Sequence, residues 1–476
     1  MSQVIESNIE TRQPVTVAHV IRGEVQLAAD VEHRFRGSAA IVRTPRISLD
    51  QLVWSRAEPG PAFEVPIGEI IDFLAEAGRR LDLTSNRFLA EAIEQSAPYS
   101  PLGRRVMENC YRDIPNFFRR EGILLEIERS LGGPGVLDGW KSAPGTGGEP
   151  ARIRAYPPRL VHVLAGNAPA VQALTIVRAA ITKGVHLLKL PSNDFFTATA
   201  ILRTFVDMDP NHPVTKSFSA VYWRGGDERI ESPIFRSQYF DKIVVWGGEA
   251  AVRHASKYVG PGFEMVSFDP KVSISLIGRE IFESESALED AARLAGRDVG
   301  DYDQDACNSS RFQFVEGTTE QVDRYCLKLL HELGRDTPFG NGKGAVVPKY
   351  LRDEIDALRS LDSIYGVFGN YDGRGVVIRS DEPVGFTPTG KAVNVVQVAS
   401  LESAVRHVTV ATQTVGIWPS CRRKALRDGL SSAGAQRITT LGTASGVGGG
   451  FGGLPHDASW PLNRFMRWIL DSGAQD

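Results

Sequence analysis

Cysteine is scarce in this chain, and the spacings that give cysteine a structural role are missing. Only four cysteines occur in 476 residues, and no two of them form a Cys-x-x-Cys pair. Disulfide frameworks and structural zinc sites need more cysteines at closer spacing, which argues against both. The nine histidines include no His-Glu-x-x-His motif. The sequence therefore predicts no metal site.

An excess of charge of either sign is also absent. Lys and Arg number 54 and Asp and Glu 57, which gives a net charge of −3. Nucleic acids and anionic membrane surfaces attract strongly basic proteins, so we expect neither as a partner. The N-terminus lacks the basic and apolar regions of a secretory signal, and we expect a cytoplasmic protein. The most apolar stretch, residues 161–181, contains Asn167 and Pro169, which favours a buried strand, turn and helix over a membrane span.

The composition and the pattern after residue 159 predict a large α/β protein. Hydrophobic residues make up 42% of the chain and charged residues 23%, as in ordinary globular proteins. Strand-length apolar runs alternate with helical periodicity, which is typical of parallel βαβ units whose ligands bind at the carboxyl ends of the strands. Strands are expected at 159–165, 185–190, 218–223, 242–246, 272–277, 312–315, 392–398, 415–418 and 437–441, with helices between them and a last helix near 461–470.

Two common motifs are missing from this pattern. No Gly-x-Gly-x-x-Gly follows a predicted strand, and no Gly-x-Ser-x-Gly elbow indicates a hydrolase. The segment Phe339–Gly344 lacks the Lys-Ser or Lys-Thr ending of a phosphate loop. The run Gly446–Gly453 is too dense in glycine for a nucleotide fingerprint, and we expect a mobile loop there.

Three side chains are candidates for chemistry. Cys307 lies on a polar loop between a predicted helix and a strand, where either a nucleophile or a packing cysteine would fit. Asn167 follows the first predicted strand, and its amide could donate to an oxyanion or cap the helix that starts at Pro169. His456, beside the glycine-rich run, could be a general acid, a substrate contact or a surface turn residue.

In their order along the chain, six segments resemble the LuxC-type acyl-CoA (fatty acid) reductase family, which belongs to the aldehyde dehydrogenase superfamily. They are AGNAPA from residue 165, LLKLPSND from 187, VVWGG from 244, FDPKVS from 268, DQDACNSSR from 303 and GGFGGLPHD from 449. The resemblance implies an aldehyde dehydrogenase-like α/β fold, with a Rossmann-like cofactor domain, an α/β catalytic domain and a small oligomerisation element. The resemblance covers roughly residues 155–476. Together with the residue pattern it predicts a largely helical region and flap at 1–150, the cofactor domain at 151–280, the catalytic domain at 281–440, and a glycine-rich loop and helix at 441–476.

The resemblance also assigns roles to matching residues. Cys307 matches the catalytic cysteine, with Gln304 preserved three residues before it, and Asn167 matches the oxyanion asparagine. NAD-dependent members commonly carry a glutamate where this chain has Ser192 and Asn193, and a carboxylate there would repel a 2′-phosphate. NADPH is therefore expected to be accepted and preferred. The cofactor-binding residues implied are Lys189, Ser192, Asn193, Trp246, Gly247 and Gly248.

The base that hydrolyses the thioester in many aldehyde dehydrogenases is missing at its matching position. Ser267 stands there, while Glu264 and Asp269 lie close in sequence but out of register. We therefore expect a thioester on Cys307 to persist, with Glu264, Gln304 and His456 as accessory candidates.

Together these features predict NADPH-dependent reduction of an acyl-CoA to the aldehyde through an acyl-cysteine intermediate. The same residues would serve a CoA-acylating aldehyde dehydrogenase that works in the oxidative direction. A non-catalytic scaffold that presents acyl groups within a multienzyme complex is a third interpretation. The resemblance further implies a homo-oligomer, with an acyl-donor enzyme as a candidate partner.

Overall fold

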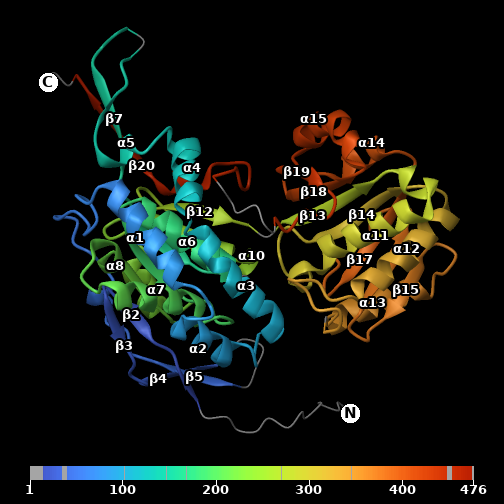
Figure 1. Ribbon diagram of the computed structural model, residues 1–476, viewed down its shortest axis with the longest axis horizontal. Coiled ribbons are helices and arrows are strands. Elements are labelled where there is room, and N and C mark those ends of the chain that lie inside the picture. The colour runs from blue at the N-terminus through green and yellow to red at the C-terminus, as the bar shows by residue number, and fades with distance from the viewer. Residues whose placement is uncertain are drawn as a thin grey trace. The chain divides into compact units, whose positions relative to one another are not determined.

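The chain folds into two compact units, each built around its own sheet. The computed structural model describes residues 14–34, 40–100, 102–145, 147–167, 169–269, 271–344, 346–446 and 453–473. Unit 1 comprises residues 1–269 and 461–476, and unit 2 comprises residues 270–460. Each unit contains a seven-stranded sheet with mostly parallel neighbours, covered by helices (Figure 1). The predicted α/β class is confirmed.

The sheet of unit 1 has the strand order that places a ligand site between two neighbouring strands. Its strands are, from edge to edge, β12 (Glu264–Phe268), β11 (Lys242–Trp246), β8 (Arg159–Val163), β9 (Val185–Lys189), β10 (Phe218–Val221), β2 (His19–Ile21) and β3 (Glu24–Gln26). The chain passes from β8 to β9 and β10 on one side, and then crosses to β11 on the other side of β8, all in parallel. Ligands of parallel sheets bind beyond the carboxyl ends of the strands at such a reversal.

Helices from both ends of unit 1 pack on this sheet. The apolar stretch 161–181 forms β8, a turn and α6, so the predicted strand, turn and helix are confirmed. Arg178 on α6 and Glu126 on α4 form a buried ion pair, with 2.5 Å between Nε and Oε1. The first 150 residues therefore belong to the same compact unit as this sheet. The helices are α1 (Ile67–Arg80), α2 (Arg87–Ser96), α3 (Gly103–Phe117), α4 (Arg120–Leu131), α5 (Gly135–Asp138), α6 (Pro169–Ile181), α7 (Thr197–Met208), α8 (Pro213–Lys216), α9 (Glu228–Ile234), α10 (Glu249–Ser256) and α16 (Pro461–Phe465).

Two small sheets complete unit 1, and one of them corrects the sequence analysis. The expected C-terminal helix over 461–470 is wrong, because α16 ends at Phe465 and the chain continues as a strand. That strand pairs with β7, which lies far earlier in the chain, and local periodicity does not reveal this partner. The strands are β6 (Lys141–Ser142), β7 (Ala151–Tyr156) and β20 (Arg467–Ser472) in this sheet, and β1 (Val15–Thr16), β5 (Ile41–Thr44) and β4 (Val31–Arg34) in the other.

Unit 2 repeats the layered plan, with helices on both faces of its sheet. Along β14, Val315 faces the cluster formed with α11 and α12, while the adjacent Phe314 faces the cluster formed with α14 and α15. The strands are, in order, β15 (Gly366–Asn370), β16 (Gly375–Ser380), β17 (Ala392–Val398), β14 (Ser310–Glu316), β13 (Val272–Ile277), β18 (Thr412–Trp418) and β19 (Arg437–Thr440). The helices are α11 (Glu285–Gly300), α12 (Thr319–Leu333), α13 (Lys349–Arg359), α14 (Leu401–Ala404) and α15 (Arg423–Ala433).

The boundary between the units differs from the expected division after residue 280. β13 pairs with β14 and β18, so the chain enters unit 2 before β13 begins. Residues 441–460, which the sequence analysis grouped with the C-terminus, also belong to unit 2.

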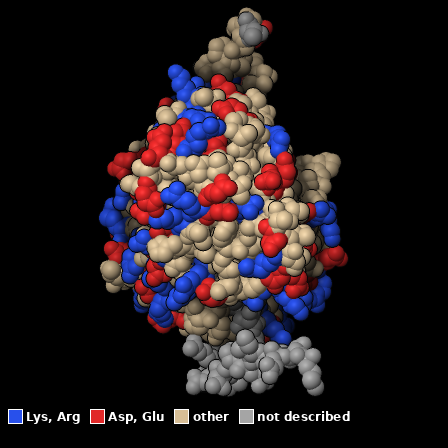
Figure 2. Space-filling model, turned by 90° about the vertical axis from the view of Figure 1, so that its right-hand side faces the viewer, with Lys and Arg blue, Asp and Glu red and all other residues tan. Residues whose placement is uncertain are grey.

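The surface and the helices show few special features. Basic and acidic side chains are interspersed on the face that Figure 2 shows. No helix within the described ranges has the length and apolar character needed to cross a bilayer. The same residues contain no group of three or more His, Cys, Asp or Glu side chains placed to hold a metal ion.

Candidate active site

The carboxyl edge of the unit 1 sheet carries the residues expected to bind the cofactor. Lys189 ends β9, Ser192 and Asn193 lie on the turn that follows, and Asn167 lies between β8 and α6. A Cβ atom added to Gly166 would overlap the side-chain amide of Asn193. The loops after β8 and β9 are therefore in contact, and a glycine at 166 permits that approach.

Lys189 is nearly buried, and its charge depends on its surroundings. Burial lowers the pKa of Lys189 to about 8, although the Glu231 carboxylate acts in the opposite direction. Its Nζ atom lies 5.8 Å from the ring centre of Tyr222 and 5.5 Å from that of Trp223. The ammonium group at the end of β9 thus lies near two aromatic rings, and the Glu231 carboxylate favours its charged form.

Asp194, the nearest carboxylate in the segment expected to read the ribose, points into the protein. Its side chain accepts hydrogen bonds from the backbone N–H of Thr197 at 3.0 Å, the Thr197 hydroxyl at 2.6 Å and the Gln172 amide at 2.8 Å. Burial raises the pKa of Asp194 despite these donors. The residue therefore caps the first turn of α7, and its oxygens are engaged within the protein.

The loop after β11 brings a helix start to the same edge. Trp246 stacks on Phe268 with 3.6 Å between ring centres. A Cβ atom added to Gly247 would lie 3.0 Å from the Cβ atom of Ala251. A Cβ atom added to Gly248 would have no neighbouring atom within 4 Å. Gly248 is the N-cap residue of α10 and, as a glycine, has no side chain that could cap the helix. A phosphate could therefore approach the N–H groups of this helix start closely.

Cys307 lies in unit 2 at the opposite edge, just before the amino end of β14. Its backbone carbonyl accepts a hydrogen bond of 2.8 Å from the Ser273 hydroxyl at the start of β13. The Nε2 atom of Gln413, at the start of β18, donates to the Cys307 sulfur at 3.1 Å. The half-buried thiol therefore faces a hydrogen-bond donor at the point where the chain order of this sheet reverses.

His456 interacts with this thiol and also with the neighbouring Asp457 carboxylate. Its Nδ1 atom lies 3.3 Å from Oδ1 of Asp457, which also lies 3.4 Å from Nζ of Lys271. Burial alone would lower the pKa of His456, but hydrogen bonds with Asp457 and Cys307 outweigh it and raise the pKa to about 9. At neutral pH the imidazole beside the sulfur is therefore protonated.

A strained and braced loop precedes Cys307. Tyr302, Asp303 and Gln304 all have positive φ angles, at 56°, 51° and 66°. The buried Gln304 amide donates to the carbonyls of Ser310 at 3.1 Å and Ala392 at 2.7 Å. Such strain persists only where surrounding bonds hold the backbone, as is common at functional sites. Gln304 therefore supports the loop.

The remaining candidates are placed as follows. Glu264 lies on β12 in unit 1 and pairs with Lys242 at 3.2 Å. Strand geometry turns it to the face opposite Ser267, as expected. Residues 447–452, most of the predicted mobile loop, lie outside the described residues.

Sequence reasoning missed three residues around the thiol. Gln413 contacts Cys307, and Lys271 contacts Asp457. These contacts depend on β13, β14 and β18 being neighbours, which no local sequence pattern shows. Asp457 follows His456 directly, so an acidic residue beside a candidate histidine was an available signal.

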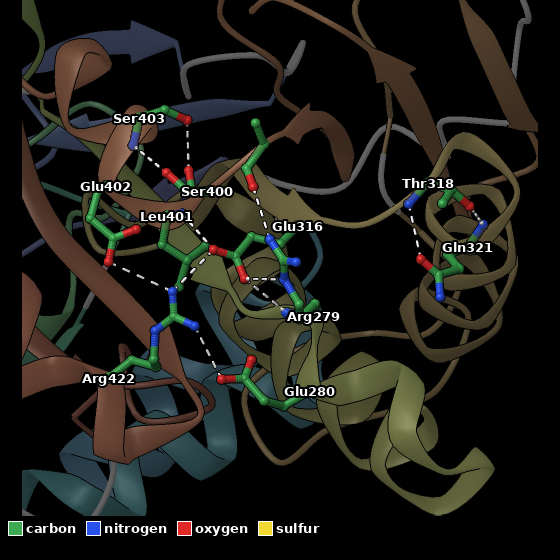
Figure 3. A network of polar contacts seen from close by, with 11 residues as sticks. Arg279, Glu280, Glu316, Thr318, Gln321, Ser400, Leu401, Glu402, Ser403 and Arg422 are labelled. Atoms are coloured by element: carbon green, nitrogen blue, oxygen red, sulfur yellow. Dashed lines mark hydrogen bonds and ion pairs between the residues drawn. The ribbon is translucent and has the colours of Figure 1, made fainter.

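The carboxyl edge of the unit 2 sheet contains a network of charged side chains instead of a predicted site (Figure 3). Glu316, buried at the end of β14, accepts hydrogen bonds from the N–H groups of Arg279 at 3.1 Å and Leu401 at 2.7 Å. Arg422 reaches both Glu316 at 3.0 Å and Glu280 at 3.1 Å. Burial would raise the pKa of Glu316, but these donors lower it overall.

Comparison with known proteins yields close relatives over most of the chain. The sequence model of the acyl-CoA reductase (LuxC) family matches residues 62–468. The long-chain acyl-protein thioester reductase of Photorhabdus laumondii is 30% identical over 416 residues, which cover 84% of this chain and 81% of that protein. The protein of the same name from Vibrio harveyi is 27% identical over 421 residues, covering 85% and 83%.

Solved structures show the same fold at much lower identity. An NAD-dependent benzaldehyde dehydrogenase from Corynebacterium glutamicum superposes with a TM-score of 0.70 at 15% identity, covering 98% of each chain. An NADP-dependent glyceraldehyde-3-phosphate dehydrogenase from Bacillus halodurans gives 0.69 at 13% identity, covering 97% of this chain and 99% of that one. The aldehyde dehydrogenase-like α/β fold is therefore confirmed.

Proposed function

The chain belongs to the acyl-CoA reductase (LuxC) family, and on that premise we propose that it reduces an acyl thioester to the aldehyde with NADPH, through an acyl-Cys307 intermediate. The observation that carries the proposal is the contact of the Cys307 thiol with Gln413 and with the His456–Asp457 pair. A packing cysteine would have no need of a donor, a protonated imidazole and a carboxylate around its sulfur.

In the first step the Cys307 thiolate attacks the acyl carbonyl, a new C–S bond forms and the thiol of CoA leaves. His456, protonated below about pH 9, gives its proton to the leaving thiolate and regains one from solvent. We propose an oxyanion contact for the backbone N–H of Cys307, and one for Asn167 by its likeness to the superfamily asparagine.

The second step is reduction of the acyl carbon, for which a bound nicotinamide cofactor would supply the hydride. The resulting thiohemiacetal oxyanion collapses, the C–S bond breaks, and aldehyde leaves with Cys307 again a thiolate. Lys189, Ser192 and Asn193 would hold the ribose of that cofactor, and the turn Trp246–Gly248 would receive its phosphates. The N–H groups at the start of α10 and the open space at Gly248 support this placement.

Water is not expected to compete with hydride for the acyl-enzyme. At neutral pH the protonated His456 has no lone pair with which to activate water. Ser267, where hydrolytic relatives have a glutamate, is no base by itself. With aldehyde and NADP⁺ but no CoA, we expect at most one turnover, while sustained acid formation would contradict the mechanism.

The proposed preference for NADPH is supported by the hydrogen bonds of Asp194. Because its oxygens are engaged by Thr197 and Gln172, no carboxylate of this segment is available to repel a 2′-phosphate. Comparison of kcat/KM for NADPH and NADH tests this, and a large preference for NADH would contradict it.

The assay that tests the whole proposal follows NADPH oxidation with a panel of acyl-CoAs and with acylated carrier or donor proteins. Aldehyde formation with any of them supports it. Activity only from aldehyde to acyl-CoA would favour the oxidative direction, and the absence of activity would favour a scaffold.

We also propose that the protein is cytoplasmic and forms a homo-oligomer. The exposed Trp468 and Leu470 on β20 support the oligomer. Light scattering tests the oligomeric state.

A further inference from the structure

We propose that Glu231 is a positioning residue of the nucleotide site, whose buried carboxylate fixes the loop after β10 and keeps Lys189 charged. The inference rests on the proposed function, because it takes Lys189 to hold the ribose. Glu231 lies on α9, outside every segment that carries the family resemblance, and its side chain is only 2% exposed.

One carboxylate joins two segments that follow different strands. Its Oε1 atom accepts hydrogen bonds from the Trp223 indole at 2.9 Å and from the N–H of Gly226 at 3.2 Å. Its Oε2 atom lies 2.5 Å from Nε2 of His254 on α10 and 3.3 Å from the Tyr258 hydroxyl. The loop after β10 is thereby tied to the helix whose start faces the phosphates.

The same carboxylate favours the charged form of Lys189. The ring of Trp223, which Glu231 holds by its indole N–H, is one of the two rings beneath the Lys189 ammonium. A Cβ atom at Gly225, in the held loop, would lie 3.9 Å from Nζ of Lys189. A nearly buried ammonium needs a negative partner to remain charged, and Glu231 is the charged group that acts on it.

Several other titratable groups surround this pair. His254 and Tyr258 contact Glu231 directly, and the charge of Glu228 contributes to raising the pKa of Tyr258. Tyr222 is the other ring beneath Lys189. Burial raises the pKa of Tyr222, and the charge of Arg224 acts in the opposite direction. A test must therefore separate the charge of Glu231 from its hydrogen bonds and from the charge of its neighbours.

Glu231→Gln makes this separation in the full-length protein. The amide oxygen can still accept from Trp223 and Gly226, but the negative charge is gone. NADPH binding, followed by its fluorescence, is measured from pH 6 to pH 9 for the parent, Glu231→Gln and the control Glu228→Gln. Glu228 is exposed on the same helix.

If loss of the carboxylate lowers the pKa of Lys189 from about 8 by about one unit, the Kd of Glu231→Gln is expected to be within about twofold of the parent at pH 6, about fivefold weaker at pH 8 and nearly tenfold weaker at pH 9. Glu228→Gln should follow the parent throughout. In a Lys189→Arg background, where the cation stays charged, Glu231→Gln should no longer change the pH profile. Titration of the 2′-phosphate is common to all variants and cancels in the ratios.

A Glu231→Gln profile that parallels the parent, or is offset by a constant factor at every pH, would overturn the inference. If the parent binds NADPH and only this variant behaves otherwise than expected, the proposed function stands and the role of Glu231 fails. If the parent does not bind NADPH, the proposed function fails, and the inference with it.

Discussion

The two units contain sheets of similar design, but their candidate residues lie at opposite edges. In unit 1, the loops at the carboxyl ends of β8, β9 and β11 carry polar side chains, glycines and a helix start. In unit 2, the matching position between β13 and β18 is taken by Arg422, which bridges Glu280 and Glu316 (Figure 3). Cys307 lies at the amino edge, before β14. A parallel sheet thus offers a ligand position at a reversal of strand order, but the side chains there decide whether it is used.

Loss of the nucleophile is the largest change expected at the amino edge of unit 2. Cys307→Ala should lower reductase activity by at least about 10³-fold, because no other group can form the acyl-enzyme. NADPH binding, measured by fluorescence, should be unchanged, because the nucleotide residues belong to unit 1. The control is Cys326→Ala, a buried thiol in the unit 2 core, which should retain turnover and lose about 1 kcal/mol of stability. Equal activity of Cys307→Ala and parent would refute the assignment.

Removal of the proton donor should have the next largest effect. His456→Ala is expected to lower kcat/KM by about 10²–10⁴-fold, the usual contribution of a general acid. The protonated form is the active one, so activity of the parent is present below about pH 9 and lost as the pH rises through that value. This alkaline limb should disappear in the variant. The exposed His331 provides the control, and a similar loss in His331→Ala would show that the effect is unspecific.

The charge network at the other edge of unit 2 should affect stability alone. Glu316→Ala leaves two N–H groups without their acceptor and removes one of the carboxylates that pair with Arg422, which is expected to cost about 3 kcal/mol of unfolding free energy. The site should be unaffected, because β14 separates Glu316 from the Cys307 loop by about 20 Å at roughly 3.3 Å per residue. Urea denaturation and kcat/KM measure the two effects. The exposed Glu402, 3.7 Å from Arg422, should contribute less than about 1 kcal/mol. A large loss of kcat/KM in folded Glu316→Ala would show that both edges serve catalysis.

Acid should affect the core of unit 1 through two neighbouring histidines. His162 and His186 lie on β8 and β9 with 3.2 Å between ring nitrogens, and burial lowers the pKa of His162 to about 3 and that of His186 well below 6.5. The unfolded chain therefore binds these protons first. Stability is full above about pH 6.5 and falls as the pH decreases, by about 1.4 kcal/mol per pH unit for each histidine.

Thermal unfolding between pH 7 and pH 5 measures this dependence. His162→Gln should show a smaller decrease in Tm over that range than the parent, even if it starts from a lower value. The control His331→Gln, at an exposed position of unit 2, should follow the parent. An unchanged slope in His162→Gln would contradict the account.

The sequence predicted most of the fold because its strands are apolar and its helices periodic. β8, β9, β11 and β13 lie within one or two residues of their expected bounds. The C-terminal strand could not be predicted, since only its pairing with β7 makes it a strand. Cys307 and Asn167 could be named from local motifs. Gln413, Lys271 and Glu231 could not, because only the folded sheets bring them to their partners.

The most direct test of the central claim is mass spectrometry of the acylated protein. The full-length protein is incubated with an acyl-CoA in the absence of nucleotide, digested, and examined for peptides that carry the acyl mass; NADPH is then added to a parallel sample. The account predicts one acyl group, on the peptide that contains Cys307, and its release as aldehyde when NADPH is added. An acyl group on another residue, or acyl-Cys307 that NADPH does not discharge to aldehyde, would contradict it.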